Sequence, residues 1–357
     1  MHLYSKLYFY YARNAINYLL DYLKLGENDV ILTPAWDCCE VLEPFIKKKC
    51  MLIFYKTDPY TFKVDIEDLE SKISKDTKLI HIINHFGHIQ EWDTIYKVLQ
   101  GRNIPILEDN AFSLHSKNNS KEIGSFGDFS IFSFRKVLPV SNGSVLIFNK
   151  ITNLQKRNHP IVYFNEIKQV PFYILDLINF NLGFFFREIW YRLRNRDILK
   201  LNDNNYNNRN KNSSEIEINL NRYKASSLFC QHLVNYYSNM YIRKINNIKI
   251  KRYLYLSESL NNIKGVRIIN PDIENIVPTL FSILIENRDC ILIKLRNQGF
   301  PVRVWPTLSS KILLRIKDFP DVKLLSESIL QIELFSFQRV DYELLVKEIL
   351  EHSKNEQ

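Results

Sequence analysis

The first 110 residues alternate short apolar runs with segments whose apolar residues recur at helical spacing. The apolar runs fall at residues 30–33, 51–55, 79–84 and 104–107, and the helical patterns between them fall at 37–48, 66–74 and 93–100. A further helical pattern at 14–25 precedes them, and Gly26 stands where a helix C-cap is expected. Such alternation is typical of an α/β fold with a mostly parallel sheet covered by helices on both faces, and ligands bind at the carboxyl ends of its strands.

The pattern changes after residue 150. Residues 151–200 form an aromatic helical segment, 201–214 an Asn-rich polar loop, and 219–260 a helical region with a long helix from Gln231 onward. Strand patterns at 279–285 and 301–304 and a final helical pattern at 342–352 suit a smaller α+β domain. We therefore predict a large domain over residues 1–218 and a small C-terminal domain over residues 219–357.

Charged residues stand at the ends of two apolar strands between residues 107 and 148. Glu108 and Asp109 follow Leu107, and Lys136 follows the strand-like Phe132-Ser133-Phe134. Burying an aspartate or a lysine without a partner is costly or shifts its pKa strongly. A carbonyl cofactor accounts for both residues, because the lysine amine condenses with an aldehyde and the carboxylate holds a pyridinium nitrogen. The pair therefore points to pyridoxal 5′-phosphate.

Several segments in order resemble the DegT/DnrJ/EryC1/StrS family of sugar aminotransferases. They are Pro34-Ala35-Trp36-Asp37-Cys38, Leu107-Glu108-Asp109-Asn110-Ala111, Phe132-Ser133-Phe134-Arg135-Lys136 and Asn142-Gly143-Ser144. The resemblance implies a fold type I pyridoxal-phosphate enzyme whose large domain, 1–218, binds the cofactor. It also implies a homodimer that transfers an amino group, with glutamate as donor, to a nucleotide-linked keto sugar in surface-polysaccharide or related biosynthesis.

The resemblance assigns roles to individual residues. Lys136 would carry the cofactor and move protons, and Asp109 would hold the ring nitrogen. The remaining cofactor-binding candidates are Arg13 and Asn14 at a helix N-terminus, Trp36 or Cys38 for ring stacking, Phe112, and Ser133 for the phosphate. His85 would line the substrate site. Phe112 departs from the Gln or His of the family, which removes a hydrogen bond to the ring hydroxyl of the cofactor.

Other interpretations of the same residues remain open. Lys136 could be a surface lysine after an edge strand, Asp109 a helix N-cap, and Arg13 a surface arginine. The chain could also be a non-catalytic binding or regulatory protein that retains the fold, an alternative that Phe112 favours. A family dehydratase is a further alternative, although those enzymes replace the cofactor lysine with histidine.

The histidines and cysteines do not predict a metal site. His81 and His85 would lie on one face of a strand about 13 Å apart, too far to share an ion. Five cysteines with one adjacent pair form a poor disulfide framework, which favours reduced thiols and a cytoplasmic location.

The formal charge of +9 is interpreted as a solvated lysine-rich surface, and no nucleic-acid partner is predicted. Charged and amide residues interrupt the hydrophobic window 171–193, which argues against a transmembrane helix. Its aromatic residues beside arginines leave peripheral membrane contact as a less favoured alternative to a core or dimer-interface role.

Overall fold

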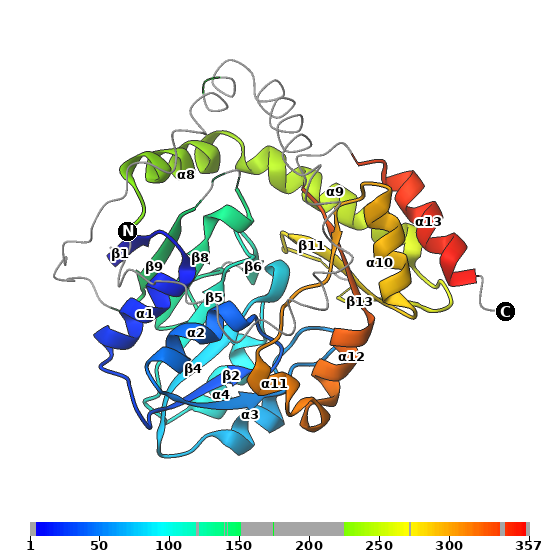
Figure 1. Ribbon diagram of the computed structural model, residues 1–357. Coiled ribbons are helices and arrows are strands. Elements are labelled where there is room, and N and C mark those ends of the chain that lie inside the picture. The colour runs from blue at the N-terminus through cyan, green and yellow to red at the C-terminus, as the bar shows by residue number, and fades with distance from the viewer. Residues whose placement is uncertain are drawn as a thin grey trace.

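The computed structural model describes residues 5–118, 121–138, 140, 142–150, 174, 225–270, 273–335 and 340–354 (Figure 1). The aromatic segment predicted at 151–200, Ile174 apart, and the polar loop predicted at 201–214 lie outside these residues.

A seven-stranded sheet forms the centre of the larger part of the molecule. Its strands stand in the order β1-β9-β8-β5-β4-β2-β3. Their bounds are Ser5–Phe9, Ser144–Phe148, Phe129–Ser133, Ile106–Asn110, Thr77–Ile83, Val30–Pro34 and Met51–Tyr55 in that order. The five strands from β8 to β3 are parallel, whereas β9 runs antiparallel to both of its neighbours. The mostly parallel sheet predicted from the sequence is therefore confirmed.

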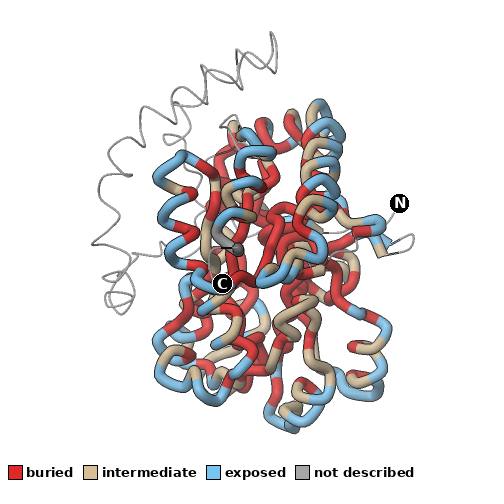
Figure 2. The backbone as a smooth tube through the Cα atoms, turned by 90° about the vertical axis from the view of Figure 1, so that its right-hand side faces the viewer, coloured by how far each residue is buried: buried red, intermediate tan, exposed pale blue. Residues whose placement is uncertain are grey.

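Helices cover both faces of this sheet, because its strands contribute apolar side chains to a buried cluster on each face. One core contains residues of α1 (Ala12–Tyr22), α2 (Cys39–Lys47), α11 (Ser310–Leu313) and α12 (Pro320–Ser328). The core on the other face contains residues of α3 (Ile66–Lys72), α4 (Trp92–Leu99) and α8 (Leu228–Met240). Figure 2 shows the buried segments inside and the exposed ones on the outer sides of the helices.

Two expected boundaries differ from the structure. The strand predicted at 104–107 is β5, which continues to Asn110 because its polar residues find hydrogen-bond partners inside the fold. The expected C-cap at Gly26 is wrong: α1 ends at Tyr22, and Lys24 takes the left-handed conformation with φ of 57°. Leu25 N–H then donates to Leu20 O, which closes the helix end before Gly26 is reached.

The smaller part of the molecule is built on a four-stranded antiparallel sheet of order β10-β11-β13-β12. These strands span Val266–Ile268, Leu280–Ile285, Ile329–Glu333 and Val302–Arg303. The helices α9 (Ile242–Leu260), α10 (Arg288–Asn297) and α13 (Tyr342–Lys354) pack with it. The smaller α+β unit that the sequence predicts thus consists of an antiparallel sheet with three helices, and it has a hydrophobic core of its own.

The helical region at 219–260 is not one long helix from Gln231. It forms α8 and α9, which meet at Tyr241 and run along the top of the molecule in Figure 1. Because α8 packs in the core of the large sheet, the chain returns to that sheet before it enters the smaller one. The boundary between residues 218 and 219 stays a prediction.

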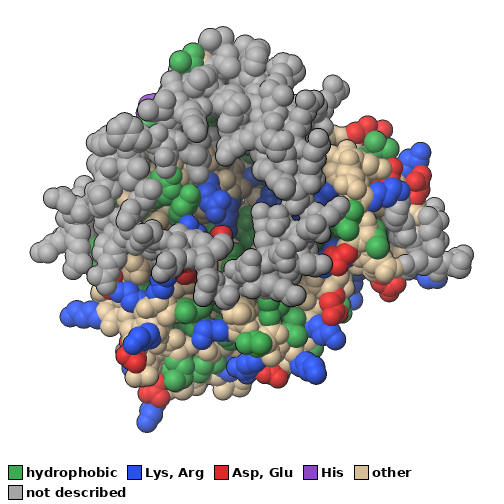
Figure 3. Space-filling model, in the orientation of Figure 1, with side chains coloured by type: hydrophobic (Ala, Val, Ile, Leu, Met, Phe, Trp, Pro, Cys, Tyr) green, Lys and Arg blue, Asp and Glu red, His purple; other side chains and the backbone are tan. Residues whose placement is uncertain are grey.

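Short elements complete the described chain. They are the β6 (Lys117–Asn118) and β7 (Lys121–Glu122) pair and the 3₁₀ turns η1 (His85–Gly87), η2 (Phe134–Lys136) and η4 (Ile316–Asp318). Lys and Arg side chains stand among Asp and Glu on the coloured part of the face in Figure 3. Among the described residues, none of the helices has the length and apolar character needed to cross a membrane.

Candidate active site

The carboxyl ends of four neighbouring strands bring the predicted site residues to one edge of the large sheet. Asp109 is the penultimate residue of β5, and Lys136 lies in η2 directly after β8. Cys38 follows β2, and His85 follows β4. Parallel strands β2, β4, β5 and β8 are adjacent in that order, so their ends meet at this edge.

Glu108 is fully buried and holds the glycine turn that precedes β8. Its carboxylate accepts hydrogen bonds from Gly124 N, Phe126 N, Gly127 N, Ser130 Oγ and Asn84 Nδ2 at 2.6 to 3.1 Å. Burial raises the pKa of Glu108, and these hydrogen bonds oppose that rise. A Cβ on Gly127 would lie 2.7 Å from Phe129 O, so only glycine fits there. The first acid of the dipeptide is therefore structural.

Asp109 is also buried, at 2% exposure, but its carboxylate has different partners. Its Oδ1 accepts a hydrogen bond from Ala111 N at 2.8 Å, and its Oδ2 lies 3.3 Å from His81 Nε2. A turn without a helix follows β5 up to residue 116. The N-cap alternative for Asp109 is therefore wrong, because no helix begins at this residue.

Lys136 is half-buried against aromatic rings. Its Nζ lies 3.9 Å from the centre of the Phe112 ring and 5.6 Å from that of Trp305. Burial lowers the pKa of Lys136, and the Cys38 thiol and the Asp109 carboxylate oppose part of this fall. A lower pKa leaves a larger fraction of the amine uncharged and nucleophilic near neutral pH. A surface lysine after an edge strand would lack this environment, and β8 is an interior strand.

The rings around Lys136 come from both sheets. Phe112 lies 5.0 Å from Trp305 and 5.3 Å from Phe86, measured between ring centres, and Trp305 follows β12 of the smaller sheet. Two hydrogen bonds join the same segments, from Thr279 Oγ1 to Phe112 O at 2.5 Å and from Thr279 N to Phe86 O at 2.8 Å. We call Phe112, Phe86 and Trp305 the aromatic wall.

His85 packs behind the aromatic wall and does not contact solvent. Its ring centre lies 6.3 Å from that of Trp305, and its Nδ1 has no hydrogen-bond partner among the described residues. Burial lowers the pKa of His85 to about 3, so its imidazole is neutral near pH 7. Its predicted role in lining the substrate site stays a prediction.

A basic end of the site forms where α1 begins. Arg13 and Arg135 both lie over the Tyr11 ring, with their Cζ atoms 4.7 and 5.3 Å from its centre. The Arg13 Nε is buried and has no partner in the described chain. Asn14 is buried at the first turn, where its Oδ1 accepts from Tyr11 N at 3.2 Å. Two guanidinium groups beside a helix N-terminus suit an anion.

The same end lies beside Ser133 through a chain of backbone hydrogen bonds. Gly143 N donates to Tyr10 O, and Phe134 N donates to Gly143 O, each at 2.9 Å. Gly143 has φ of 108°, a conformation that favours glycine, and this turn joins the start of α1 to the end of β8. Ser133 is therefore held near Arg13 and Arg135 by the backbone.

The two candidates for ring stacking have different surroundings. Trp36 has no exposed surface and packs in the core with α1 and α2, and its Nε1 has no partner among the described residues. Cys38 is buried close to Lys136, and hydrogen bonding with Cys39 together with burial raises the pKa of its thiol. The stacking role of either residue stays a prediction.

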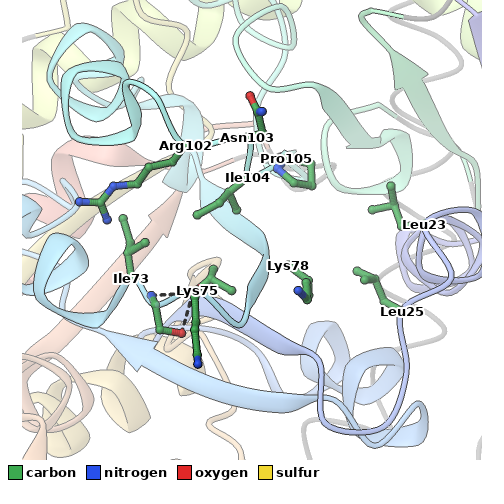
Figure 4. Close-up of a pocket in the computed structure, with 11 residues that line it drawn as sticks. Leu23, Leu25, Ile73, Lys75, Lys78, Arg102, Asn103, Ile104 and Pro105 are labelled. Atoms are coloured by element: carbon green, nitrogen blue, oxygen red, sulfur yellow. Dashed lines mark hydrogen bonds between the residues drawn. The ribbon is translucent and has the colours of Figure 1, made fainter.

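The described residues contain no group of three or more His, Cys, Asp or Glu that could hold a metal ion. A surface groove of about 690 Å³ lies at the opposite edge of the sheet, near the amino ends of β4 and β5. Figure 4 shows Lys75, Lys78 and Arg102 around it, and none of the predicted site residues lines it. Its position separates it from the candidate active site.

Sequence reasoning missed three residues of this site. They are His81, which the sequence suggests only as a metal ligand, Arg135, which stands there only as part of a motif, and Trp305, to which the sequence assigns no role. The available signal for His81 was its position two residues before Ile83, on the same face of a strand whose other polar residues, Thr77 and Lys78, stand at its start. Its partner could not be predicted without the strand order.

Comparison with known proteins matches residues 12–154 to the DegT/DnrJ/EryC1/StrS aminotransferase family. A similar curated protein is the GDP-perosamine synthase of Escherichia coli O157:H7, 29% identical over 140 residues. That alignment covers 39% of this chain, and the chain spans only 38% of the length of that relative.

Solved structures resemble nearly the whole chain. The aminotransferase TlmJ from Streptoalloteichus hindustanus has a TM-score of 0.69 at 14% identity, covering 97% of this chain and 85% of that one. The GDP-4-keto-6-deoxy-D-mannose-3-dehydratase of E. coli, with bound hydrated PLP, has a TM-score of 0.65 at 16% identity, covering 97% and 87%. At these identities the likeness establishes the fold.

The residues at the sheet edge fit pyridoxal 5′-phosphate, the cofactor that the family match supports. The cofactor needs an amine for its aldehyde, a carboxylate for its ring nitrogen and a cation for its phosphate. The site offers Lys136 with a lowered pKa, the buried Asp109 at a strand end, and Arg13, whose buried Nε has no partner among the described residues. The fold is that of fold type I pyridoxal-phosphate enzymes, and the resemblance to the DegT/DnrJ/EryC1/StrS aminotransferase family that the sequence predicts is confirmed over residues 12–154.

Proposed function

We propose that this protein is a pyridoxal-phosphate-dependent aminotransferase that acts on a nucleotide-linked keto sugar, with glutamate as the amino donor. The observation that carries the proposal is the environment of Lys136, an amine with a lowered pKa beside Asp109 at the carboxyl edge of the sheet. The sugar nucleotide is suggested by the name of the GDP-perosamine synthase relative. Surface-polysaccharide or related biosynthesis is the proposed setting.

Each site residue has a task in this proposal. When bound, the cofactor supplies an aldehyde that condenses with amines and a pyridinium ring that withdraws electrons. Lys136 would hold the cofactor through its amine and would act as acid and base for the substrate proton. Asp109 holds the ring nitrogen in its protonated form, and Arg13, Arg135 and Ser133 bind the phosphate. The aromatic wall excludes water from the amine.

The lysine also distinguishes this proposal from a dehydratase. The structural neighbours include a dehydratase, so the fold permits either reaction. A lysine at the cofactor position favours transamination, because Lys136 would hold the cofactor through its amine and would serve as acid and base for the substrate proton. We also propose a homodimer as the active species, which the resemblance to the family implies.

Borohydride trapping tests the cofactor site. We expect purified protein with pyridoxal phosphate to develop a visible absorption band, and reduction followed by peptide mapping to locate the cofactor on Lys136. Lys136→Ala should lose both signals. Lys63→Ala is the matched control, because Lys63 is also half-buried with a pKa lowered by burial, but its amine donates to Ile89 O instead of lying against the aromatic rings around Lys136. An adduct on another lysine in the wild-type protein would refute the assignment.

Phe112 gives the non-catalytic alternative a specific basis, because it places an apolar ring against the lysine amine. That alternative predicts that the protein does not convert bound cofactor with any amino donor. A single-turnover assay with glutamate and other amino acids separates the two functions. Conversion to the pyridoxamine form supports the aminotransferase, and binding without conversion supports a binding or regulatory protein.

A further inference from the structure

A row of buried polar side chains extends from Asp109 across three adjacent strands. His81 of β4 has no exposed surface, and its Nε2 lies 3.3 Å from Asp109 Oδ2 of β5. Its Nδ1 lies 2.9 Å from Thr33 Oγ1 of β2 and 3.8 Å from Asp37 Oδ2. Buried polar groups crossing a sheet beneath helices α1 and α2 are costly unless they serve a purpose.

The hydrogen bonds define which nitrogen of His81 carries the proton. An ionised carboxylate only accepts hydrogen bonds, so Nε2 must be the protonated nitrogen that donates to Asp109. In the tautomer protonated at Nε2 alone, Nδ1 is the acceptor and the Thr33 hydroxyl donates to it. The His81 ring packs against Phe45, with 5.9 Å between ring centres, which restricts its rotation. The backbone of His81 is fixed as well, because its carbonyl accepts a hydrogen bond from Tyr55 Oη at 2.6 Å.

Asp37 lies behind the imidazole as a second buried acid. Its Oδ1 accepts from Cys38 N at 2.6 Å, whereas its Oδ2 has no hydrogen-bond partner among the described residues. Burial raises the pKa of Asp37 well above its ordinary value, which favours the neutral acid. A neutral Asp37 carries no charge beside the imidazole, which is compatible with donation from Thr33 to Nδ1.

We propose that His81 is a positioning residue, which orients the Asp109 carboxylate toward the ring nitrogen of the cofactor while Thr33 fixes the imidazole tautomer behind it. Asp109 Oδ1 and Oδ2 are each anchored by one donor, Ala111 N and His81 Nε2, which leaves a lone pair for the cofactor. The proposal rests on the proposed function for the role of Asp109. The hydrogen bond itself can be measured without cofactor.

The first measurement is nuclear magnetic resonance of the cofactor-free protein with ¹⁵N-labelled histidine rings near neutral pH. The His81 signals are assigned as those that disappear in His81→Phe. We expect a proton on Nε2 and none on Nδ1, and we expect Thr33→Val to move the Nδ1 signal toward that of an imidazole nitrogen without a donor. A proton on Nδ1 in the wild-type protein would overturn the tautomer and the proposal.

The second measurement is the affinity of the cofactor-free protein for pyridoxal phosphate. Losing one hydrogen bond to a charged group should weaken binding about tenfold to a hundredfold in His81→Phe. His81→Gln should restore much of the affinity, because its amide N–H can replace the Nε2 donor. His88→Phe is the matched control, since it replaces another buried histidine by the same ring and should leave the affinity unchanged.

These outcomes separate the two proposals. If wild-type protein binds pyridoxal phosphate on Lys136 but His81→Phe binds it equally well, the positioning role is refuted and the function stands. If His81→Gln is as weak as His81→Phe while both retain the wild-type circular dichroism, the donor role of Nε2 is refuted. If wild-type protein does not attach the cofactor to Lys136, the proposed function fails, and the positioning role fails with it.

Discussion

Lys249 provides a direct test of the energetics of the smaller domain. It lies on α9 at 3% exposure, within the stripe of buried positions that includes Ile245, Tyr253 and Leu256. A cation in such a stripe loses its hydration, and burial lowers the pKa of Lys249 from 10.5 to about 8. We expect Lys249→Met to stabilise the protein, because methionine fills a similar space without a charge.

The magnitude follows from the pKa. A fall of about 2.5 in pKa corresponds to about 3 kcal/mol at about 1.4 kcal/mol for each tenfold change. Below pH 8 the lysine is charged in both the folded and unfolded states, so the wild-type protein bears the whole penalty. Between pH 8 and 10.5 the unfolded state binds more protons, and wild-type stability rises with pH. The advantage of Lys249→Met should therefore vanish near pH 10.5.

Thermal unfolding of both proteins across this pH range is the assay. For a chain of this length that unfolds cooperatively, about 3 kcal/mol corresponds to a rise in Tm of about 4 °C at pH 7. Lys251→Met is the control, because Lys251 is an exposed residue on the same helix and should give no pH-dependent difference. A gain in Lys249→Met that persists unchanged above pH 10.5, or a loss of stability at pH 7, would refute the reasoning.

Two further predictions concern the site and the assembly. Asp109→Asn should keep the fold, since asparagine has nearly the same shape and its Oδ1 can still accept from Ala111 N, although its Nδ2 cannot accept from His81 Nε2. It should slow single-turnover conversion with glutamate about a hundredfold or more, because a neutral amide cannot stabilise a pyridinium. Equal rates in mutant and wild type would remove Asp109 from the mechanism. Light scattering at assay concentration should give the mass of a dimer, and a fully active species of 42.6 kDa would contradict that prediction.

The sequence predicts the large sheet well because its signal is local. Apolar runs between helical patterns mark β2, β3 and β4 within a few residues. Asp109 and Lys136 stand at the ends of the apolar runs of β5 and β8. The pair of Lys136 and Asp109 could be chosen from residue type alone, since neither charge suits a strand end without a partner. These predictions needed no knowledge of which strands are neighbours.

The rest of the site depends on contacts between distant segments. The partner of Asp109 is His81, and that contact requires β4 and β5 to be adjacent and their side chains to share a face. Trp305 reaches Lys136 only because the smaller sheet docks on the larger one. The extension of β5 through Glu108 likewise depends on backbone donors from residues 124 to 127. Periodicity carries no information on such pairings.

The aromatic wall has a consequence for the order in which the protein folds. The hydrogen bond from Thr279 to Phe112 joins residues that are 167 positions apart, and Trp305 comes later still in the chain. Contacts of such long range form late, because a large loop must close before they stabilise anything. During synthesis the large sheet can therefore assemble before Trp305 reaches Lys136, and the burial that lowers the pKa of its amine is complete only when the last third of the chain has docked.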